Sequence, residues 1–280
     1  MEPRLQRRVQ RYGWDLAAAR YEALWQAQLA PAHQAVLDGA SLMPGEAVLD
    51  AACGTGLVTL RAAQQVGPNG VVVGVDTSGR MVEVAQRHAR ACNCTNTSFM
   101  RNDLENLALS DASFDVALCS LGLMYMPDAG QALQVMRRAL RPGGRLAVAV
   151  WGPQARCGWS SVFSIVETEV TSDVCPLFFR LGASGALAAL CADAGFEVTD
   201  ERRIAVSLSY ADADEACAAV FLGGPAALAW SRFDANARDR ARQRYVDAIE
   251  AWRDGPGYEI PGEFVVITAA VSSRHAPVRR

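Results

Sequence analysis

The sequence predicts an α/β fold with a doubly wound, mostly parallel sheet, and three observations lead to that prediction. Between residues 47 and 151, short β-branched runs alternate with amphipathic stretches. The runs are apolar on both faces, as strands covered by helices on each side must be. A glycine-containing turn follows the first run directly. Because strands that alternate with helices are joined by right-handed crossovers, we expect a Rossmann-like sheet of seven strands.

The core elements are predicted from these patterns in chain order. Strands are expected at 47–51, 70–76, 97–101, 114–120 and 144–151, and helices at 57–66, 79–91 and 128–140. The last helix should stop in the stretch "LRPGG", because proline and paired glycines end a helix and begin a turn.

Two segments break this alternation. Residues 1–40 are expected to form a helical cap, and residues 41–151 form the cofactor-binding core. Residues 152–280 are predicted to supply an aromatic-rich substrate lid, the last strands and a helical insertion. In that part we expect a helix at 184–194, strands at 196–210 and 262–271, and more helix at 212–254. No repeat or low-complexity linker divides the 280 residues, so one domain is predicted.

Composition excludes several classes of protein. A net charge of −3 argues against a dedicated nucleic-acid binder. No signal peptide core or apolar run of membrane length is present, so we expect a cytoplasmic chain without a membrane partner. All 27 basic residues are arginine, which excludes lysine chemistry. The eight cysteines lack the paired spacing of a zinc or redox site, and no metal is expected.

The glycine turn "DAACGTG" indicates the kind of ligand. Sheets of this class bind nucleotide-like molecules at such turns. Asp76, at the end of the second strand, is positioned to accept ribose hydroxyls. The third glycine of the dinucleotide fingerprint is missing, and Asp50 before the turn would repel a pyrophosphate but favour a cation or an α-amino group. A ligand with ribose, ammonium and carboxylate groups is S-adenosylmethionine.

Five segments in order carry a resemblance to a known family. "VLDAACGTG", "VVGVDTSGRMVEVA", "RNDLENL", "SFDVALCSLGLMYMPD" and "ALRPGGRLAVAVWG" resemble class I S-adenosylmethionine-dependent methyltransferases. The chain is most similar to the ubiquinone/menaquinone C-methyltransferase-like (methyltransferase type 11) family, over about residues 40–152. One departure is Ala52, where the family most often has a glycine; alanine is tolerable there if its φ is negative.

The resemblance implies a role for each matching residue. The turn would hold the methionine part of the cofactor, Asp76 its ribose, and later segments its adenine and sulfonium. For Asp103 a turn-forming role and for Met81 a core position are the alternatives. The implied cofactor contacts are Asp50, Ala51, Ala52, Gly54, Thr55, Gly56, Asp76, Thr77, Met81, Asn102, Asp103, Leu104 and Ser120.

The acceptor side is predicted from aromatic content, although these residues could instead form core beneath a lid. We expect a small aromatic or quinone-like acceptor, methylated at oxygen or carbon, with Arg180 meeting a carboxylate or phenolate. No catalytic base is assigned; Tyr125 and His33 are candidates, and a surface helix position is the simplest expectation for His33. The predicted substrate contacts are Tyr21, Trp25, Tyr125, Trp151, Phe178, Phe179 and Arg180.

Two other functions stay open at this point. A protein of the same fold could bind the cofactor without transferring a methyl group. A metalloid methyltransferase would use thiols as soft ligands, and Cys119, Cys157 and Cys175 flank the predicted pocket. The partners expected are a small-molecule methyl acceptor and, as an option the sequence leaves open, a second copy of the chain in a homodimer.

Overall fold

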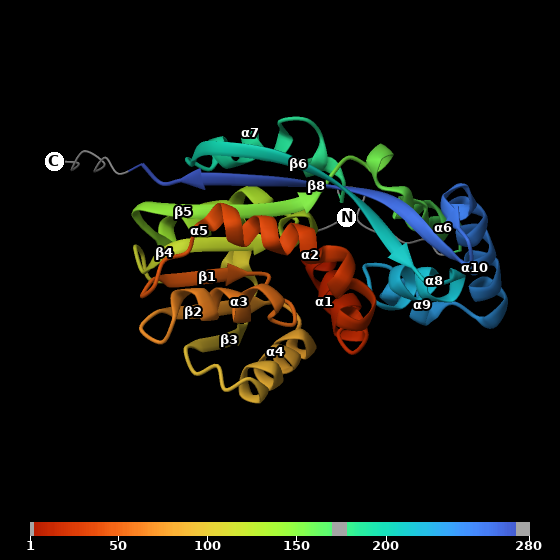
Figure 1. Ribbon diagram of the computed structural model, residues 1–280, viewed down its shortest axis with the longest axis horizontal. Coiled ribbons are helices and arrows are strands. Elements are labelled where there is room, and N and C mark those ends of the chain that lie inside the picture. Colours follow the sequence, from red (N-terminus) through yellow and green to blue (C-terminus); the bar gives the residue numbers. More distant parts are fainter. Residues whose placement is uncertain (1–2, 170–177, 273–280) are drawn as a thin grey trace.

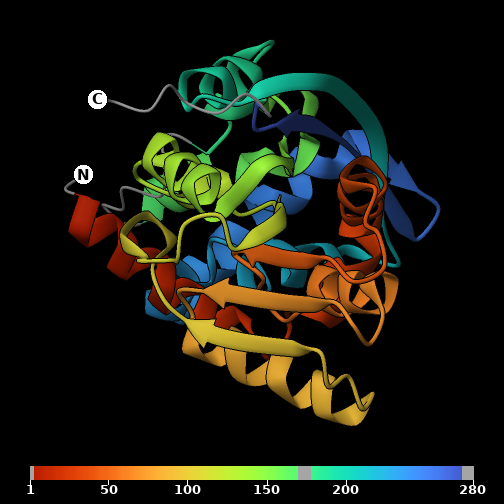
Figure 2. The ribbon, with the colours of Figure 1, turned by 90° about the vertical axis from the view of Figure 1, so that its left-hand side faces the viewer.

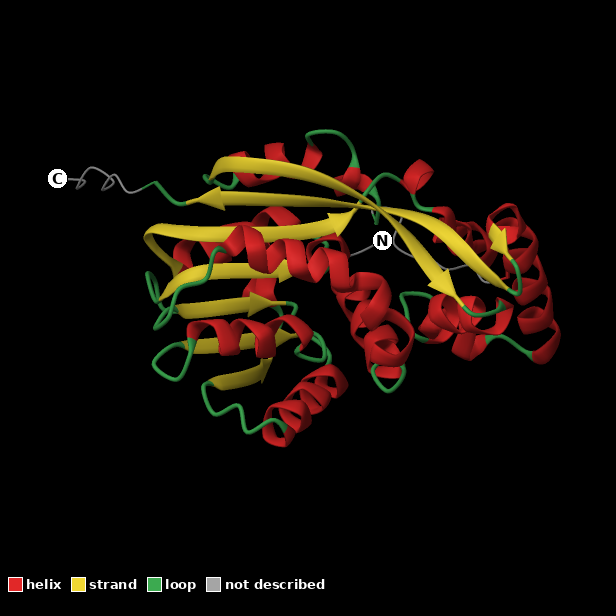
Figure 3. Ribbon diagram, in the orientation of Figure 1, coloured by secondary structure: helices red, strands yellow, loops and turns green. Residues whose placement is uncertain are grey.

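The computed structural model describes residues 3–169 and 178–272, and its centre is one eight-stranded sheet (Figures 1 and 3). The strand order is β3-β2-β1-β4-β5-β8-β6, and the short β7 pairs with β8. The strands are β1 (Ala47–Ala51), β2 (Val71–Asp76), β3 (Thr97–Arg101), β4 (Phe114–Ser120), β5 (Leu140–Trp151), β6 (Glu197–Tyr210), β7 (Arg253–Asp254) and β8 (Gly257–Ala270).

Helices cover both faces of this sheet, as its apolar strands require. Figure 2 shows α2 and α3 along one face and α5 on the other. The helices are α1 (Pro3–Ala17), α2 (Tyr21–Ala40), α3 (Leu57–Val66), α4 (Gly79–Ala91), α5 (Ala129–Ala139), α6 (Ser161–Glu169), α7 (Ala186–Asp193), α8 (Ala213–Leu222), α9 (Ala227–Arg232) and α10 (Ala235–Ile249).

Strands β1 to β5 are mutually parallel, and β8 runs antiparallel between β5 and β6. The predicted Rossmann-like, mostly parallel sheet is therefore confirmed. The predicted turn at "LRPGG" is absorbed into β5, which begins at Leu140. Its pairing with β4 jumps from Phe114–Leu140 to Val116–Arg145, so the proline and glycines form an irregular stretch in the strand.

The last strand begins earlier than its sequence predicts. β8 starts at Gly257 and passes through Pro261, which reads as a turn residue. Pro261 pairs with Ser207 of β6, whereas the pairing of β8 with β5 extends only to Phe264. A proline is tolerated where a strand has one partner, because its missing N–H then leaves no bond unmade. Beyond β5, the β6–β8 pair continues toward α8, α9 and α10 (Figure 1).

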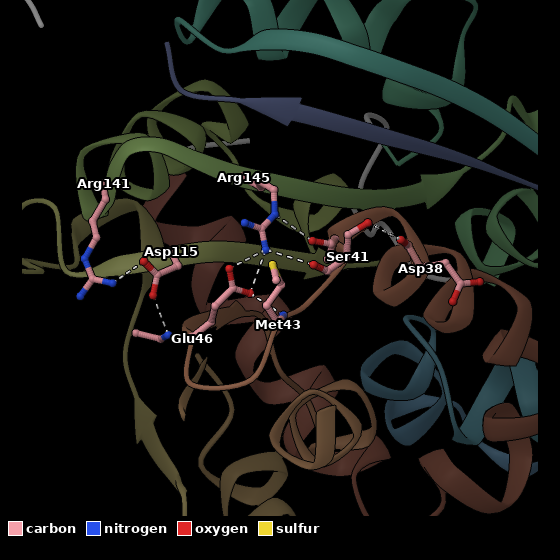
Figure 4. Close-up of polar contacts among 9 residues, drawn as sticks. Asp38, Ser41, Met43, Glu46, Asp115, Arg141 and Arg145 are labelled. Atoms are coloured by element: carbon pink, nitrogen blue, oxygen red, sulfur yellow. Dashed lines mark hydrogen bonds and ion pairs between the residues drawn. The ribbon is translucent and has the colours of Figure 1, made fainter. Parts of the chain in front are cut away.

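Ion pairs tie the loops at the amino edge of the sheet (Figure 4). Arg145 donates from Nε to the Ala40 carbonyl at 3.0 Å and from Nη2 to both Glu46 carboxylate oxygens at 2.8 Å. Asp115 accepts the backbone N–H of Ala47 at 2.8 Å and is also bonded to Arg141. These contacts fix the end of α2 and the start of β1, so the amino edge is closed by structural bonds.

Candidate functional site

A cavity lies at the opposite edge, where β1, β2 and β4 end and α1 lies beyond their arrowheads (Figure 1). It holds about 800 Å³ of space including its mouth, which is within the range of small-molecule sites. The lining residues are Arg7, Gln10, Trp14, Tyr21, Ala52, Gly54, Val75, Asp76, Thr77, Met81, Asn102, Asp103, Leu104, Glu105, Ser120, Leu121, Gly122, Tyr125, Met126 and Pro127. We call it the cofactor cavity, after the ligand that the sequence predicts for it.

The turn between β1 and α3 forms the floor of this cavity. Ala52 has φ 58° and Gly54 has φ 53°, both in the left-handed region. The negative φ that the sequence argument required at Ala52 is therefore absent, and left-handed backbone costs alanine roughly 1–2 kcal/mol. The methyl group fits because residue 122 is glycine: a Cβ on Gly122 would lie 2.3 Å from the Ala52 Cβ.

Asp76 connects the turn to the end of β2. Its Oδ2 accepts the backbone N–H of Gly54 at 2.9 Å, and its Oδ1 accepts that of Ser78 at 2.8 Å. Burial raises the pKa of this carboxyl to about 6, although the backbone bonds oppose the shift. Each oxygen keeps a further lone pair, so Asp76 can still accept hydrogen bonds from hydroxyl groups of a ligand.

Asp50 lies beneath the turn and is almost completely buried. It accepts a hydrogen bond of 2.5 Å from the Thr59 hydroxyl of α3. Burial raises the pKa of Asp50 to about 7, and the nearby Asp76 carboxylate raises it further while the Thr59 bond lowers it. Two carboxylates in this sheltered region make it favourable to a cation and unfavourable to a phosphate.

The other side of the cavity is closed by α1. Arg7 donates to both carboxylate oxygens of buried Glu105, at 2.8 and 3.1 Å, and its Nε lies 3.2 Å from Asp103. At the other end of the helix, Asp15 accepts the Ser78 hydroxyl at 2.6 Å. Arg7, Gln10, Trp14 and Glu105 also line the cavity and were not predicted, because no pattern in an amphipathic N-terminal helix shows which loop it will cover.

Most of the predicted cofactor contacts meet in this cavity. Asp103 also caps the turn Leu104–Asn106, and Met81 is also buried in α4, so both readings of each residue fit the structure. Ala51 is buried inside β1 and Gly56 caps α3, so both support the turn from behind. Those that line the cavity are Ala52, Gly54, Asp76, Thr77, Met81, Asn102, Asp103, Leu104 and Ser120.

A second, smaller space adjoins the first, and we call it the aromatic cavity. It holds about 320 Å³ and shares Trp14, Tyr21, Leu121 and Tyr125 with the cofactor cavity. Three tryptophan rings form its far wall, with ring centroids 5.0–6.2 Å apart. Among the described residues its lining carries no charge; these lining residues are Trp14, Tyr21, Trp25, Leu29, Leu121, Met124, Tyr125, Trp151, Trp159, Gly224 and Pro225.

Three predicted substrate residues, Phe178, Phe179 and Arg180, lie outside the linings of both cavities. Phe178 is buried and packs 5.1 Å from the Tyr125 ring, and Phe179 packs against Trp159 and Phe163. Arg180 is exposed.

The surface position expected for His33 is wrong. His33 is buried on the same face of α2 as Val36 and Leu37, and it lines a small cavity together with residues of the turn. Burial and the charge of Arg61 lower the pKa of His33 to about 4. At neutral pH its imidazole is therefore uncharged.

Neither a metal site nor a membrane-spanning helix is found among the described residues. Across residues 3–169 and 178–272, no group of three metal-ligating side chains occurs, and no helix is long and apolar enough to cross a membrane. Burial raises the pKa of Cys119 to about 12 and that of Cys157 to about 11, which disfavours thiolate ligands. Cys175 lies outside the described residues.

Comparisons with known proteins agree with this geometry. Residues 42–173 match the family model described as a methyltransferase domain. The chain is 34% identical over 126 residues to demethylmenaquinone methyltransferase from Lactobacillus johnsonii, covering 43% of this chain and 52% of that protein. The chain thus spans about half the length of this relative.

Solved structures share the fold at low identity. A [4+2]-cyclase structure superposes with a TM-score of 0.61 and 22% identity, covering 91% of this chain and 84% of that one. An N-methyltransferase from Haemonchus contortus, solved with phosphomonomethylethanolamine and S-adenosylhomocysteine, has a TM-score of 0.59 and 17% identity. It covers 92% of this chain and 57% of the other. The comparisons thus show that residues 42–173 are similar to a methyltransferase domain and that the chain shares its fold with these solved structures.

Proposed function

We propose that this chain uses S-adenosylmethionine to methylate a small, uncharged aromatic or quinone-like molecule at oxygen or carbon. One observation carries the proposal: an acidic cavity suited to a cationic nucleoside adjoins an aromatic cavity whose described walls carry no charge. Tyr21 and Tyr125 belong to both linings, so a group in one space can meet a group in the other. The named relative, a demethylmenaquinone methyltransferase, supports this acceptor class.

The residues of the cofactor cavity fit S-adenosylmethionine. Asp76 would accept the ribose hydroxyls, and Asn102 and Asp103 would face the adenine. The hydroxyls of Thr55 and Ser120 are buried without a hydrogen-bond partner in the described residues, as expected of groups that a ligand satisfies. A dinucleotide fits poorly, because its pyrophosphate would lie near the carboxylates of Asp50 and Asp76.

When bound, the cofactor supplies an electrophilic methyl group on a sulfonium. The protein's part is to align the acceptor and exclude water. Helix α1 and the tryptophan rings of the aromatic cavity exclude water, and the ring faces orient a planar acceptor. Burial and the Asp76 charge raise the pKa of Tyr21 well above its ordinary value. Tyr21 therefore stays a neutral phenol that can position a group by hydrogen bonding, and Tyr125 remains the candidate for assisting deprotonation.

The uncharged lining that the described residues give the aromatic cavity favours a different acceptor from the anionic one expected from Arg180. An anionic acceptor would leave its charge unpaired in the aromatic cavity, and such burial costs several kcal/mol. A neutral phenol, quinol or similar ring can pack its apolar faces against the tryptophan rings without burying an unpaired charge.

The test is incubation with methyl-labelled S-adenosylmethionine and paired acceptors. Each pair contains a neutral phenol or quinol and the same ring bearing a carboxylate. We expect label transfer to neutral rings and little to their carboxylates. Transfer to the carboxylates alone would contradict the acceptor class. Cofactor binding without transfer to any ring would favour a cofactor-binding protein of the same fold.

A further inference from the structure

A third, small cavity lies behind the turn. It holds about 300 Å³, and Tyr21, Ala52, Gly54 and Ser120 line both it and the cofactor cavity. The remaining lining residues are His33, Asp50, Cys53, Thr55, Leu57 and Val58. The space is therefore a side chamber of the cofactor cavity, closed at its far end by α2.

Two hydroxyl groups in this chamber lack the partners that buried groups normally have, and a buried imidazole shares its lining with them. Within the described chain, the buried hydroxyl oxygens of Thr55 and Ser120 have no hydrogen-bond partner. His33 is 6% exposed and lines the same space. Buried polar groups in native proteins are nearly always bonded to protein, water or ligand. These three converge on one space, so one ligand group can satisfy them together.

The chemistry of the chamber indicates which group that is. Two hydroxyls and a neutral imidazole can all donate hydrogen bonds, and the first turn of α3 lies beside them with its N–H groups unpaired inside the helix. Donors and a helix N-terminus favour an anionic oxygen. Asp50 on the same lining favours a neighbouring ammonium group. A carboxylate and an ammonium on one carbon are the end of an amino acid.

We propose that His33 is a cofactor-binding residue whose imidazole, with the hydroxyls of Thr55 and Ser120, binds the carboxylate of the cofactor's amino-acid end. This inference rests on the proposed cofactor. It says that α2, through His33, recognises the cofactor's carboxylate. It also gives His33 a role other than that of general base, because His33 does not line the aromatic cavity. His33 lies outside residues 42–173, so the matched domain does not include this contact.

The experiment compares two ligands that differ at this end. S-adenosylhomocysteine carries the amino-acid group, and 5′-methylthioadenosine has the same nucleoside and thioether without it. We expect His33→Ala to weaken S-adenosylhomocysteine at least tenfold and methylthioadenosine less than threefold by calorimetry. His33→Asn, which keeps an N–H donor, should recover much of the affinity. The matched control is His88→Ala, since His88 lies on α4 with Glu22 as its ion-pair partner.

Each outcome decides the question. An equal loss for both ligands would make His33 a structural residue, and an unchanged S-adenosylhomocysteine affinity would remove it from the site. If His33→Ala does not fold, the wild-type protein still gives an answer: the carboxyl methyl ester of S-adenosylhomocysteine should bind at least tenfold more weakly than the free acid. Equal affinity for ester and acid would overturn the proposal. Failure of the wild-type protein to bind either nucleoside would instead contradict the proposed cofactor.

Discussion

Replacing Asp76 by asparagine separates ligand recognition from folding. The carboxylate accepts the Gly54 and Ser78 backbone N–H groups, and the amide oxygen of an asparagine side chain could keep one of these bonds. Burial raises the pKa of Asp76 from 3.8 to about 6, so its ionised form costs the native state roughly 3 kcal/mol at pH 8. Removing that charge offsets the lost backbone bond, and the free energy of unfolding should change little.

The affinity should fall, because the ribose hydroxyls lose a charged acceptor. A hydrogen bond to a charged group contributes about 1.5–3 kcal/mol, which corresponds to roughly ten- to a hundredfold in Kd. Calorimetry with S-adenosylhomocysteine at pH 8 measures that loss, and thermal unfolding without ligand measures the stability.

The matched control is Asp115→Asn at the amino edge of the sheet (Figure 4). Asp115 also accepts a backbone N–H, and the bond to Arg141 holds its pKa below the ordinary value. This variant should lose stability and keep its affinity. A folded Asp76→Asn protein with unchanged Kd, or an equal affinity loss in both variants, would refute the reasoning.

Three further predictions follow from the cavities. Trp151→Leu should lower kcat/KM for the acceptor at least tenfold and leave S-adenosylhomocysteine affinity within about threefold, measured by steady-state kinetics and calorimetry, because the ring lines only the aromatic cavity. Arg7→Met should speed ligand dissociation severalfold in stopped-flow experiments, since Arg7 holds α1 to Glu105; an unchanged rate would mean that α1 does not cover the ligand. Without ligand, Asp50 and Asp76 should make stability in denaturant titrations fall as the pH rises from about 4 to about 7, and His33 opposes this fall; native Asp50, with a pKa of about 7, keeps a proton that the unfolded chain releases near 3.8. Asp50→Asn should reduce that slope, and an identical slope would contradict the assignment.

The sheet was predictable because its signals are local. The bounds of α3 and α4 match the predicted 57–66 and 79–91, since each helix follows a turn and carries a regular apolar face. The start of β8 could not be predicted in this way. In the sequence Pro261 indicates a turn, and a strand tolerates it only because β8 pairs there with β6.

The site was predictable in part for the same reason. The turn and Asp76 follow strand ends, whose carboxyl edge is shared in any parallel sheet. The positions of Arg7, Trp14 and His33 depend on how two N-terminal helices pack across that edge, which no local pattern specifies. Phe178 and Phe179 have the aromatic character of a pocket wall, and only packing against Tyr125 and Trp159 distinguishes backing residues from lining residues.

Cofactor identity tests the account most directly, and one titration measures it. The wild-type protein is titrated in a calorimeter with S-adenosylhomocysteine and, separately, with NADH. We expect micromolar affinity for S-adenosylhomocysteine and no measurable heat with NADH, because the carboxylates of Asp50 and Asp76 lie where a pyrophosphate would bind. Tight NADH binding, or no binding of S-adenosylhomocysteine by folded protein, would contradict the assignment of this cavity.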